Sequence, residues 1–168
     1  MDILDRLLGH DAWTTGQLLL RCRELSDEQL DHRFDIGDRS LRETFLHIIR
    51  NMEGWTDSMA MRTGRAAADP SAAPSVDRLL DRLFLAAKDL ADVSRRIRDE
   101  GRLDQMVADA REEPPVARPL GGMIVHVITH SMHHRAQVLY LMEQLGLTDL
   151  PEADALDWEH RAFGWRAP

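Results

Sequence analysis

The chain has 168 residues, of which 43% are hydrophobic and 30% are charged, a composition typical of a folded globular protein. We expect a single domain over residues 1–168, large enough to bury a core without disulfides. The net charge of −8 and the lack of a basic cluster argue against a nucleic-acid-binding protein, because Lys and Arg contacts to phosphates supply most of that affinity.

Three features of the sequence bear on the cellular compartment. Cys22 is the only cysteine, so no disulfide can form within the chain. The first residues lack the basic and apolar regions of a signal peptide. No apolar run approaches the ~18 residues that a membrane span needs. We therefore predict a cytoplasmic protein with no membrane partner.

Apolar residues recur at helical spacing along most of the chain, and no run of alternating β-branched residues predicts a strand. Four long helices are predicted, over residues 2–25, 40–64, 75–101 and 120–145. Residues 65–75 and 102–119 are predicted to connect them. Residues 147–168 form a tail with a short helix around 153–161. The pattern favours an all-α four-helix bundle, either antiparallel or with a crossover connection.

Two polar pairs at i, i+3 mark helix starts. Ser26 with Gln29 has the pattern of a capping box, in which the side chain of each residue accepts a hydrogen bond from the backbone N–H of the other. Ser40 with Glu43 repeats this pattern at the start of the second long helix. Glu43 also lies one turn before His47 and could orient that imidazole, but the cap accounts for it more simply.

The fourth long helix carries four histidines. Because a helix turns by ~100° per residue, His134 lies roughly 60° from the centre of the apolar stripe and His130 at its edge. His126 and His133 point toward the polar side, so we expect them at the surface or in a supporting position. Since His130 and His134 are four residues apart, their rings project from one face and can share a divalent ion. Spacing alone leaves open that they are ordinary core histidines.

His47 lies off the apolar seam of the second helix, and its spacing alone predicts a surface position. Arg135 is on the apolar side of the fourth helix, where it can bind a substrate carboxylate or form an internal ion pair. Cys22 falls on the seam of the first helix, which predicts a buried and unreactive thiol. The four tryptophans favour core positions over a pocket lining: Trp13, Trp55, Trp158 and Trp165.

Two segments resemble the motifs of the DinB-like damage-inducible family. The first reads Leu41-Arg-Glu-Thr-Phe-Leu-His47-Ile-Ile, followed by Glu53 and Trp55. The second reads His126-Val-Ile-Thr-His130-Ser-Met-His133-His134-Arg135-Ala-Gln137. The segments Leu7–Trp13 and Leu25–Leu30 are similar too, and all four occur in the order of the family.

The resemblance implies a four-helix bundle with a crossover connection, often assembled as a homodimer. It also implies a divalent metal, zinc or nickel, held by three histidines that map to His47, His130 and His134. Relatives of this family include transferases and isomerases that use low-molecular-weight thiols.

A metal with an open coordination position can lower the pKa of a bound water or thiol. We therefore expect a metal-dependent thiol S-transferase or hydrolase acting on a small electrophilic substrate. The alternative is a non-catalytic, metal-stabilised or metal-sensing dimeric bundle of the stress response. The sequence names no catalytic residue, because the metalloprotease motif His-Glu-x-x-His is absent: Ser131 and Met132 follow His130. A di-iron carboxylate protein is excluded because no Glu-x-x-His occurs.

Overall fold

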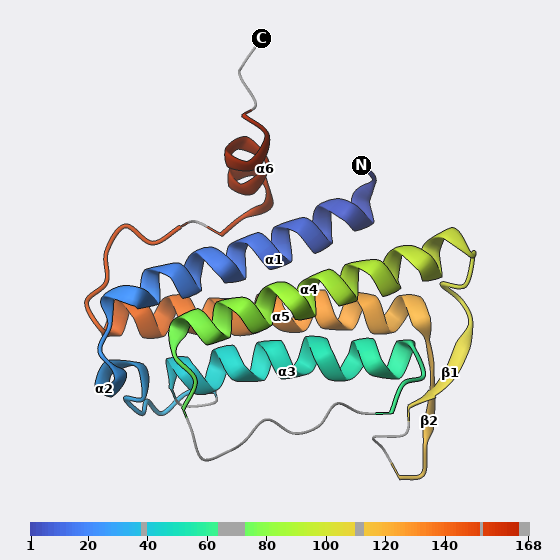
Figure 1. Ribbon diagram of the computed structural model, residues 1–168, viewed down its shortest axis with the longest axis horizontal. Coiled ribbons are helices and arrows are strands. Elements are labelled where there is room, and N and C mark those ends of the chain that lie inside the picture. The colour runs from blue at the N-terminus through green and yellow to red at the C-terminus, as the bar shows by residue number, and fades with distance from the viewer. Residues whose placement is uncertain (38–39, 64–72, 110–112, 152, 165–168) are drawn as a thin grey trace.

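The computed structural model describes residues 1–37, 40–63, 73–109, 113–151 and 153–164. Four long helices form a bundle (Figure 1): α1 (Ile3–Arg21), α3 (Leu41–Met59), α4 (Val76–Asp99) and α5 (Leu120–Gln144). The shorter elements are a 3-10 turn (Cys22–Glu24), α2 (Asp27–Leu30), β1 (Met106–Asp109), β2 (Val116–Pro119) and α6 (Ala155–Phe163). None of the described helices is long and apolar enough to cross a membrane.

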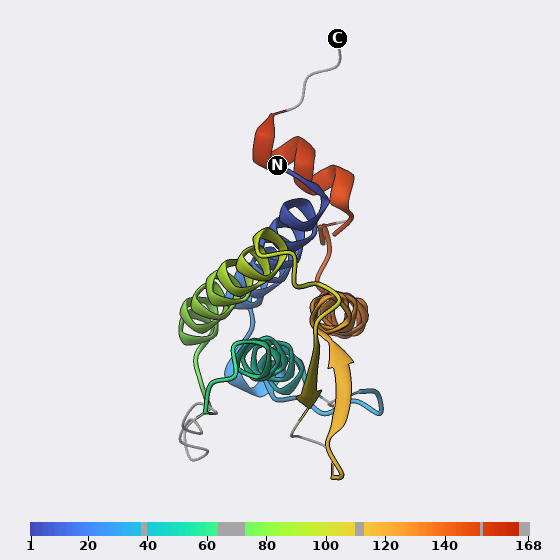
Figure 2. The ribbon, with the colours of Figure 1, turned by 90° about the vertical axis from the view of Figure 1, so that its right-hand side faces the viewer.

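The bundle contains the predicted crossover. α3 and α4 run in the same direction (Figure 1), so α3 ends and α4 begins at opposite ends of the bundle. Viewed along the helices in Figure 2, α1 packs against α4 and α5, and α3 packs against the same two helices. The predicted linker over residues 65–75 falls largely on residues 64–72, which lie outside the described part of the chain. The all-α four-helix bundle is thus confirmed.

Apolar seams account for the long helices. On α3 the apolar residues at helical spacing form a buried seam: Leu41, Phe45, Ile48, Met52, Trp55 and Met59. On α4 the buried stripe is broad, since Leu80, Ala86 and Val93 are buried beside Leu79, Leu83 and Leu90. The stripe widens because α4 packs against both α1 and α3.

Several predicted boundaries are corrected at helix ends. α1 stops at Arg21, because residues 22–24 tighten into a 3-10 turn, a common ending for a helix. α3 stops at Met59 and not near Gly64, since the backbone turns left-handed at Met61 with φ 51°. In the tail, the short helix α6 begins at Ala155 and extends to Phe163.

The predicted loop over residues 102–119 contains a β-hairpin. β1 and β2 pair antiparallel, with Met106 opposite Pro119 and Asp109 opposite Val116. Four-residue strands are too short to produce a clear alternation in the sequence. The hairpin leads directly into α5, whose first amides donate to the carbonyls of Leu103 and Gln105. These carbonyls satisfy donors that a helix start leaves unpaired.

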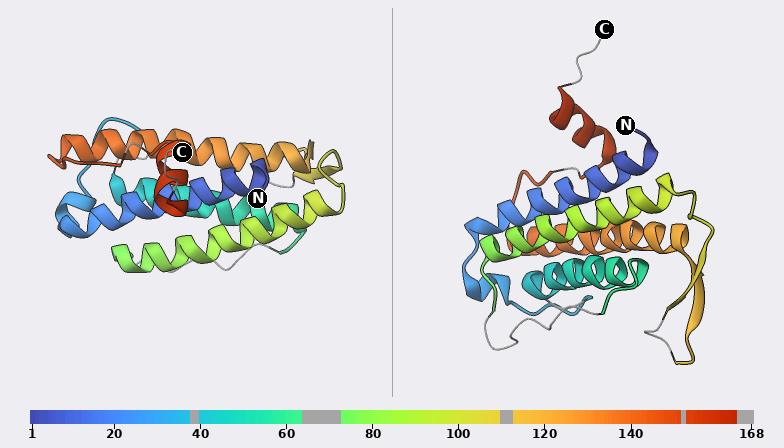
Figure 3. Two further views of the ribbon diagram at one scale, coloured as in Figure 1. Left: turned by 90° about the horizontal axis from the view of Figure 1, so that it is seen from above. Right: turned by 45° about the vertical axis from the view of Figure 1, so that its right-hand side comes forward.

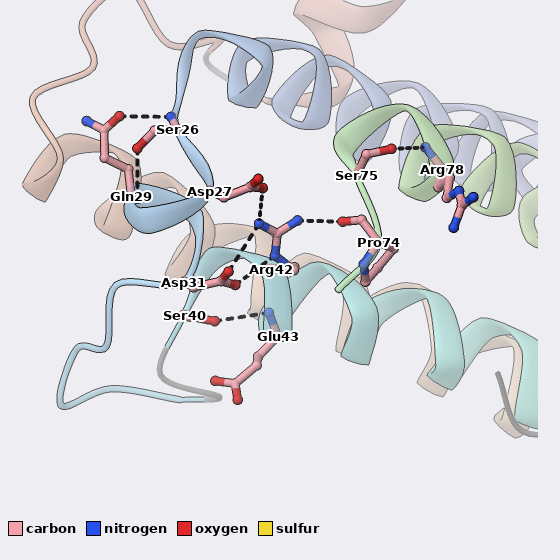
Figure 4. A network of polar contacts seen from close by, with 10 residues as sticks. All are labelled: Ser26, Asp27, Gln29, Asp31, Ser40, Arg42, Glu43, Pro74, Ser75 and Arg78. Atoms are coloured by element: carbon pink, nitrogen blue, oxygen red, sulfur yellow. Dashed lines mark hydrogen bonds and ion pairs between the residues drawn. The ribbon is translucent and has the colours of Figure 1, made fainter. Parts of the chain in front are cut away.

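The buried guanidinium of Arg42 joins three segments at one end of the bundle (Figure 4). It donates to Asp31 at 2.7 Å, to Asp27, and to the backbone carbonyl of Pro74 just before α4. Arg42 therefore fastens α2 and the start of α4 onto α3.

The same view shows the helix caps (Figure 4). Ser26 and Gln29 form the predicted capping box in full, with bonds of 3.2 and 3.0 Å. Ser40 accepts from the backbone N–H of Glu43 at 3.2 Å, while the Glu43 carboxylate lies 3.6 Å from Arg33. Ser40 therefore caps α3 as predicted, but the Glu43 side chain contacts Arg33 and does not complete the capping box.

The short helix α6 lies across the outer side of α1, away from the rest of the bundle (Figures 2 and 3). Trp158 is buried against Gly9, where an added Cβ would come within 2.7 Å of the indole ring. His10 bonds the carbonyl of Ala153 through Nε2 at 2.9 Å. α6 is therefore held on α1 by Trp158, whose ring fits there because residue 9 is a glycine without a side chain.

Candidate metal centre

The structure brings His47, His130 and His134 together between α3 and α5. Nε2 of His47 lies 3.1 Å from Nε2 of His130. The ring centre of His134 is 4.5 Å from that of His47 and 4.4 Å from that of His130. One ring nitrogen from each residue lies within 4.8 Å of the other two, and all three side chains are half-buried. Residues from two helices thus converge on one point.

This spacing fits a metal ion. Zn²⁺ bound to imidazole at ~2.0–2.1 Å in tetrahedral geometry holds its nitrogens roughly 3.3 Å apart. In the triad, two nitrogens are 3.1 Å apart and all three lie within 4.8 Å of one another. Small rotations of the rings would therefore bring all three nitrogens to ligand distance from one ion. Three imidazoles leave one tetrahedral position for water or another ligand. The three histidines can therefore hold one metal ion with an open position.

The electrostatic setting keeps His130 neutral. Burial, together with the nearby imidazoles of His134 and His47, lowers the pKa of His130 to about 4. A neutral imidazole is the form that binds a metal, because the coordinating nitrogen must carry a lone pair. The Nδ1 atom of His130 is buried and has no hydrogen-bond partner within the described part of the chain.

Gln137 supports the triad from α5. Its Oε1 lies 2.8 Å from Nδ1 of His134, and its Nε2 lies 3.3 Å from Nε2 of His133. Gln137 has no predicted role, although it is the last residue of the second family motif. Its positions three residues after His134 and four after His133 are the signal that could have identified it, since side chains so spaced meet on one helix face.

His126 and His133 lie outside the triad, as expected. Both are exposed on α5. The His126 ring packs on Trp55 with centres 4.7 Å apart, and its centre is 5.5 Å from that of His130. The His133 ring meets that of His134 edge-on, with centres 5.2 Å apart, and its Nε2 lies 3.3 Å from Nε2 of Gln137. The two histidines thus flank the candidate centre without joining it.

His47 shows where helical spacing alone gives the wrong answer, since it predicts a surface position. α3 packs against two long helices, α4 and α5. His47 lies on the side of α3 that meets α5 and is half-buried against His130 and His134. A helix with two neighbours buries a wider arc than one apolar stripe indicates.

The other candidate side chains have structural roles. Arg135 is buried and forms an ion pair with Asp11 on α1, which settles its two predicted roles in favour of the internal pair. Cys22 is fully buried, which confirms the predicted burial, and burial raises the pKa of its thiol to about 12, which disfavours the reactive thiolate.

Of the tryptophans, Trp55 and Trp158 are buried as predicted and Trp13 is half-buried. Trp165 lies outside the described residues.

Comparisons with known proteins agree with this architecture. The chain is similar to a DinB-like protein from Bacillus cereus ATCC 10987, with a TM-score of 0.64 and 20% identity over 84% of this chain and 89% of that one. It is also similar to a protein from Exiguobacterium sibiricum 255-15 described as a member of the DinB family, with a TM-score of 0.63 and 25% identity. That likeness covers 90% of this chain and 95% of the other. No curated protein matches the chain. The DinB family model matches residues 1–166, and the chain therefore belongs to the DinB family.

Proposed function

We propose that the protein is a metal-dependent enzyme that binds one divalent transition metal through His47, His130 and His134. Its activity would be to activate a low-molecular-weight thiol, or water, for attack on a small electrophilic substrate. The observation that carries this proposal is the convergence of three imidazoles from two helices, with Nε2 of His47 and Nε2 of His130 only 3.1 Å apart.

The donor set favours zinc or nickel. Imidazole suits Zn²⁺ and Ni²⁺, whereas Mg²⁺ and Ca²⁺ prefer oxygen ligands. When bound, such a metal would act as a Lewis acid that lowers the pKa of water or of a thiol at the open position. The chain's own contribution is to hold the three rings together in a half-buried seam and to keep His130 neutral at physiological pH.

Metal content of the purified protein tests the site. The wild type is expected to carry about one metal ion per chain by elemental analysis, and His130→Ala to lose it, because two ligands bind far more weakly than three. His126→Ala is the matched control, since His126 lies one turn earlier on the same helix face and outside the triad. Unchanged metal content in His130→Ala would contradict the proposal.

His47→Ala tests the third ligand separately. If His47 binds the metal, this variant should lose metal to the same degree as His130→Ala. Metal retained at the wild-type level would leave a two-histidine site on α5 and remove α3 from it.

The catalytic half of the proposal has its own assay. The metal-loaded protein is incubated with several bacterial thiols and the electrophile monochlorobimane, and conjugation is followed by fluorescence. Faster conjugation than with the metal-free protein, lost in His130→Ala, supports thiol activation. If no thiol reacts faster and the metal still binds, the alternative of a non-catalytic metal-stabilised or metal-sensing bundle takes its place.

A further inference from the structure

We propose that Gln137 is a positioning residue for the candidate metal centre. Its amide oxygen holds His134 in the tautomer with the proton on Nδ1, so that Nε2 presents the lone pair to the metal. The bare backbone of Gly37 gives the amide the room to do this. The inference rests on the proposed metal site and adds to it a residue that sets the state of one ligand.

The hydrogen bond defines the tautomer. Nδ1 of His134 lies 2.8 Å from Oε1 of Gln137, and a carbonyl oxygen can only accept a hydrogen bond. Nδ1 must therefore carry the proton, and a neutral imidazole protonated there has its lone pair on Nε2. The ring is also held in place, because Gln137 lies one turn further along the same helix face.

The other end of the amide meets His133 in an arrangement that agrees with this assignment. Nε2 of Gln137 lies 3.3 Å from Nε2 of His133, and an amide nitrogen only donates. His133 therefore accepts from the amide while His134 donates to it. A flipped amide would donate to Nδ1 of His134 and place the proton of that ring on Nε2, where it would block metal binding. The contact with His133 is compatible with the amide orientation that the metal needs, with Nε2 of His133 as the acceptor.

Gly37, in the loop between α2 and α3, lies against the same amide. A Cβ at this position would be 2.6 Å from Oε1 and 3.0 Å from Cδ of Gln137. The backbone of Gly37 is also left-handed, with φ 51°, a conformation that favours glycine. The amide is the mobile end of its side chain, so a methyl group at Gly37 would displace Gln137 and break its bond to His134.

His134 and His130 differ in this respect. Nδ1 of His134 has a glutamine oxygen as partner, whereas Nδ1 of His130 has no hydrogen-bond partner within the described part of the chain. Residues that orient a metal-binding histidine commonly alter metal affinity by about 10–100-fold when they are removed. Loss of the Gln137 bond should therefore weaken metal binding through His134.

The first experiment compares Gln137→Ala with Gln137→Glu. Zn²⁺ affinity is measured by competition with a chromophoric chelator. Nitrogen-15 NMR of the metal-free protein reports which nitrogen of His134 is protonated. Gln137→Ala should bind Zn²⁺ about 10–100-fold more weakly and show a mixture of His134 tautomers. Gln137→Glu should recover both properties, because its carboxylate also accepts from Nδ1.

The second experiment compares Gly37→Ala with Gly101→Ala. Both glycines are left-handed, with φ 51° and 65°, but a Cβ at Gly101 would meet no atom within 4 Å. Both substitutions therefore strain the backbone, and only the first reaches Gln137. Gly37→Ala should weaken Zn²⁺ binding as Gln137→Ala does, and Gly101→Ala should leave it unchanged. Equal affinities in the two alanine variants would remove Gly37 from the proposal.

The outcomes separate this inference from the metal site itself. If the wild type binds Zn²⁺ and loses it in His130→Ala, but Gln137→Ala keeps both the affinity and the Nδ1–H tautomer of His134, the role of Gln137 is refuted and the metal site stands. If the wild type binds no Zn²⁺, both fail. Circular dichroism of each variant shows that a lost affinity does not reflect an unfolded chain.

Discussion

The ion pair between Asp11 on α1 and Arg135 on α5 is expected to be the most sensitive polar contact of the bundle. The two side chains are only 2% and 3% exposed, so both charges are almost fully removed from water. Each charge depends on the other, because a lone buried charge has neither solvent nor a counter-ion. Removing one partner should therefore cost far more than removing both.

The substitution Asp11→Ala leaves the guanidinium of Arg135 with weaker neighbours, Thr15 Oγ1 at 3.4 Å and the Asp11 carbonyl at 3.5 Å. Breaking a buried pair in this way typically lowers the free energy of unfolding by about 3–5 kcal/mol. That is a large part of the roughly 5–15 kcal/mol that stabilises a typical domain. The double variant Asp11→Leu with Arg135→Met removes both charges and should regain most of the lost stability.

Urea unfolding followed by circular dichroism measures these differences. Arg95→Ala is the matched control, because Arg95 pairs with Asp5 of α1 at 2.7 Å while its side chain remains 45% exposed. An exposed pair contributes less than about 1 kcal/mol. The reasoning is refuted if Asp11→Ala is no more destabilising than Arg95→Ala, or if the double variant is no more stable than the single one.

Three further predictions concern other sites. Arg42→Ala should lower the free energy of unfolding, measured in urea, by about 2–3 kcal/mol. This is less than the sum of the Arg42 hydrogen bonds, because its carboxylate partners Asp27 and Asp31 are 87% and 49% exposed and regain water. A loss below ~0.5 kcal/mol would contradict this prediction. Cys22, with its pKa raised from 9.0 to about 12, should carry about a thousandfold less thiolate at pH 8 than an ordinary thiol. It should react with a disulfide reagent only after denaturation or as the pH approaches 12, and a fast reaction at pH 8 would refute its burial. Gly9→Ala should displace the Trp158 ring and expose α6 to proteases. Gly54→Ala, whose Cβ meets no atom within 4 Å, should not. Equal protease resistance of the two variants would contradict the packing of α6 on α1.

Local regularity made the bundle predictable. The α3 seam repeats over five turns, and such a long period outweighs the preferences of single residues. The pairing of His130 with His134 could be predicted for the same reason, because both residues lie one turn apart on a single helix. The hairpin was missed, since four-residue strands carry too short a pattern.

Features that depend on two elements were harder to predict. The burial of His47 requires knowing that α5 covers its flank of α3, and resemblance alone pointed to it. The contact between Gln137 and Gly37 joins a helix to a loop 100 positions away in sequence. The Arg42 cluster likewise reaches the carbonyl of Pro74, and a carbonyl leaves no mark in a sequence.

His47 and His130 are 83 positions apart, with α4 and the hairpin between them. At the ~5–20 residues per second of protein synthesis, His47 is made roughly 4–17 seconds before His130. By the end of that interval α1, α3 and α4 have all been made, while His130 and His134 have not. A metal bound by the triad would therefore join the chain late in its biosynthesis. Any packing of the first three long helices before that point relies on their apolar seams and not on the metal.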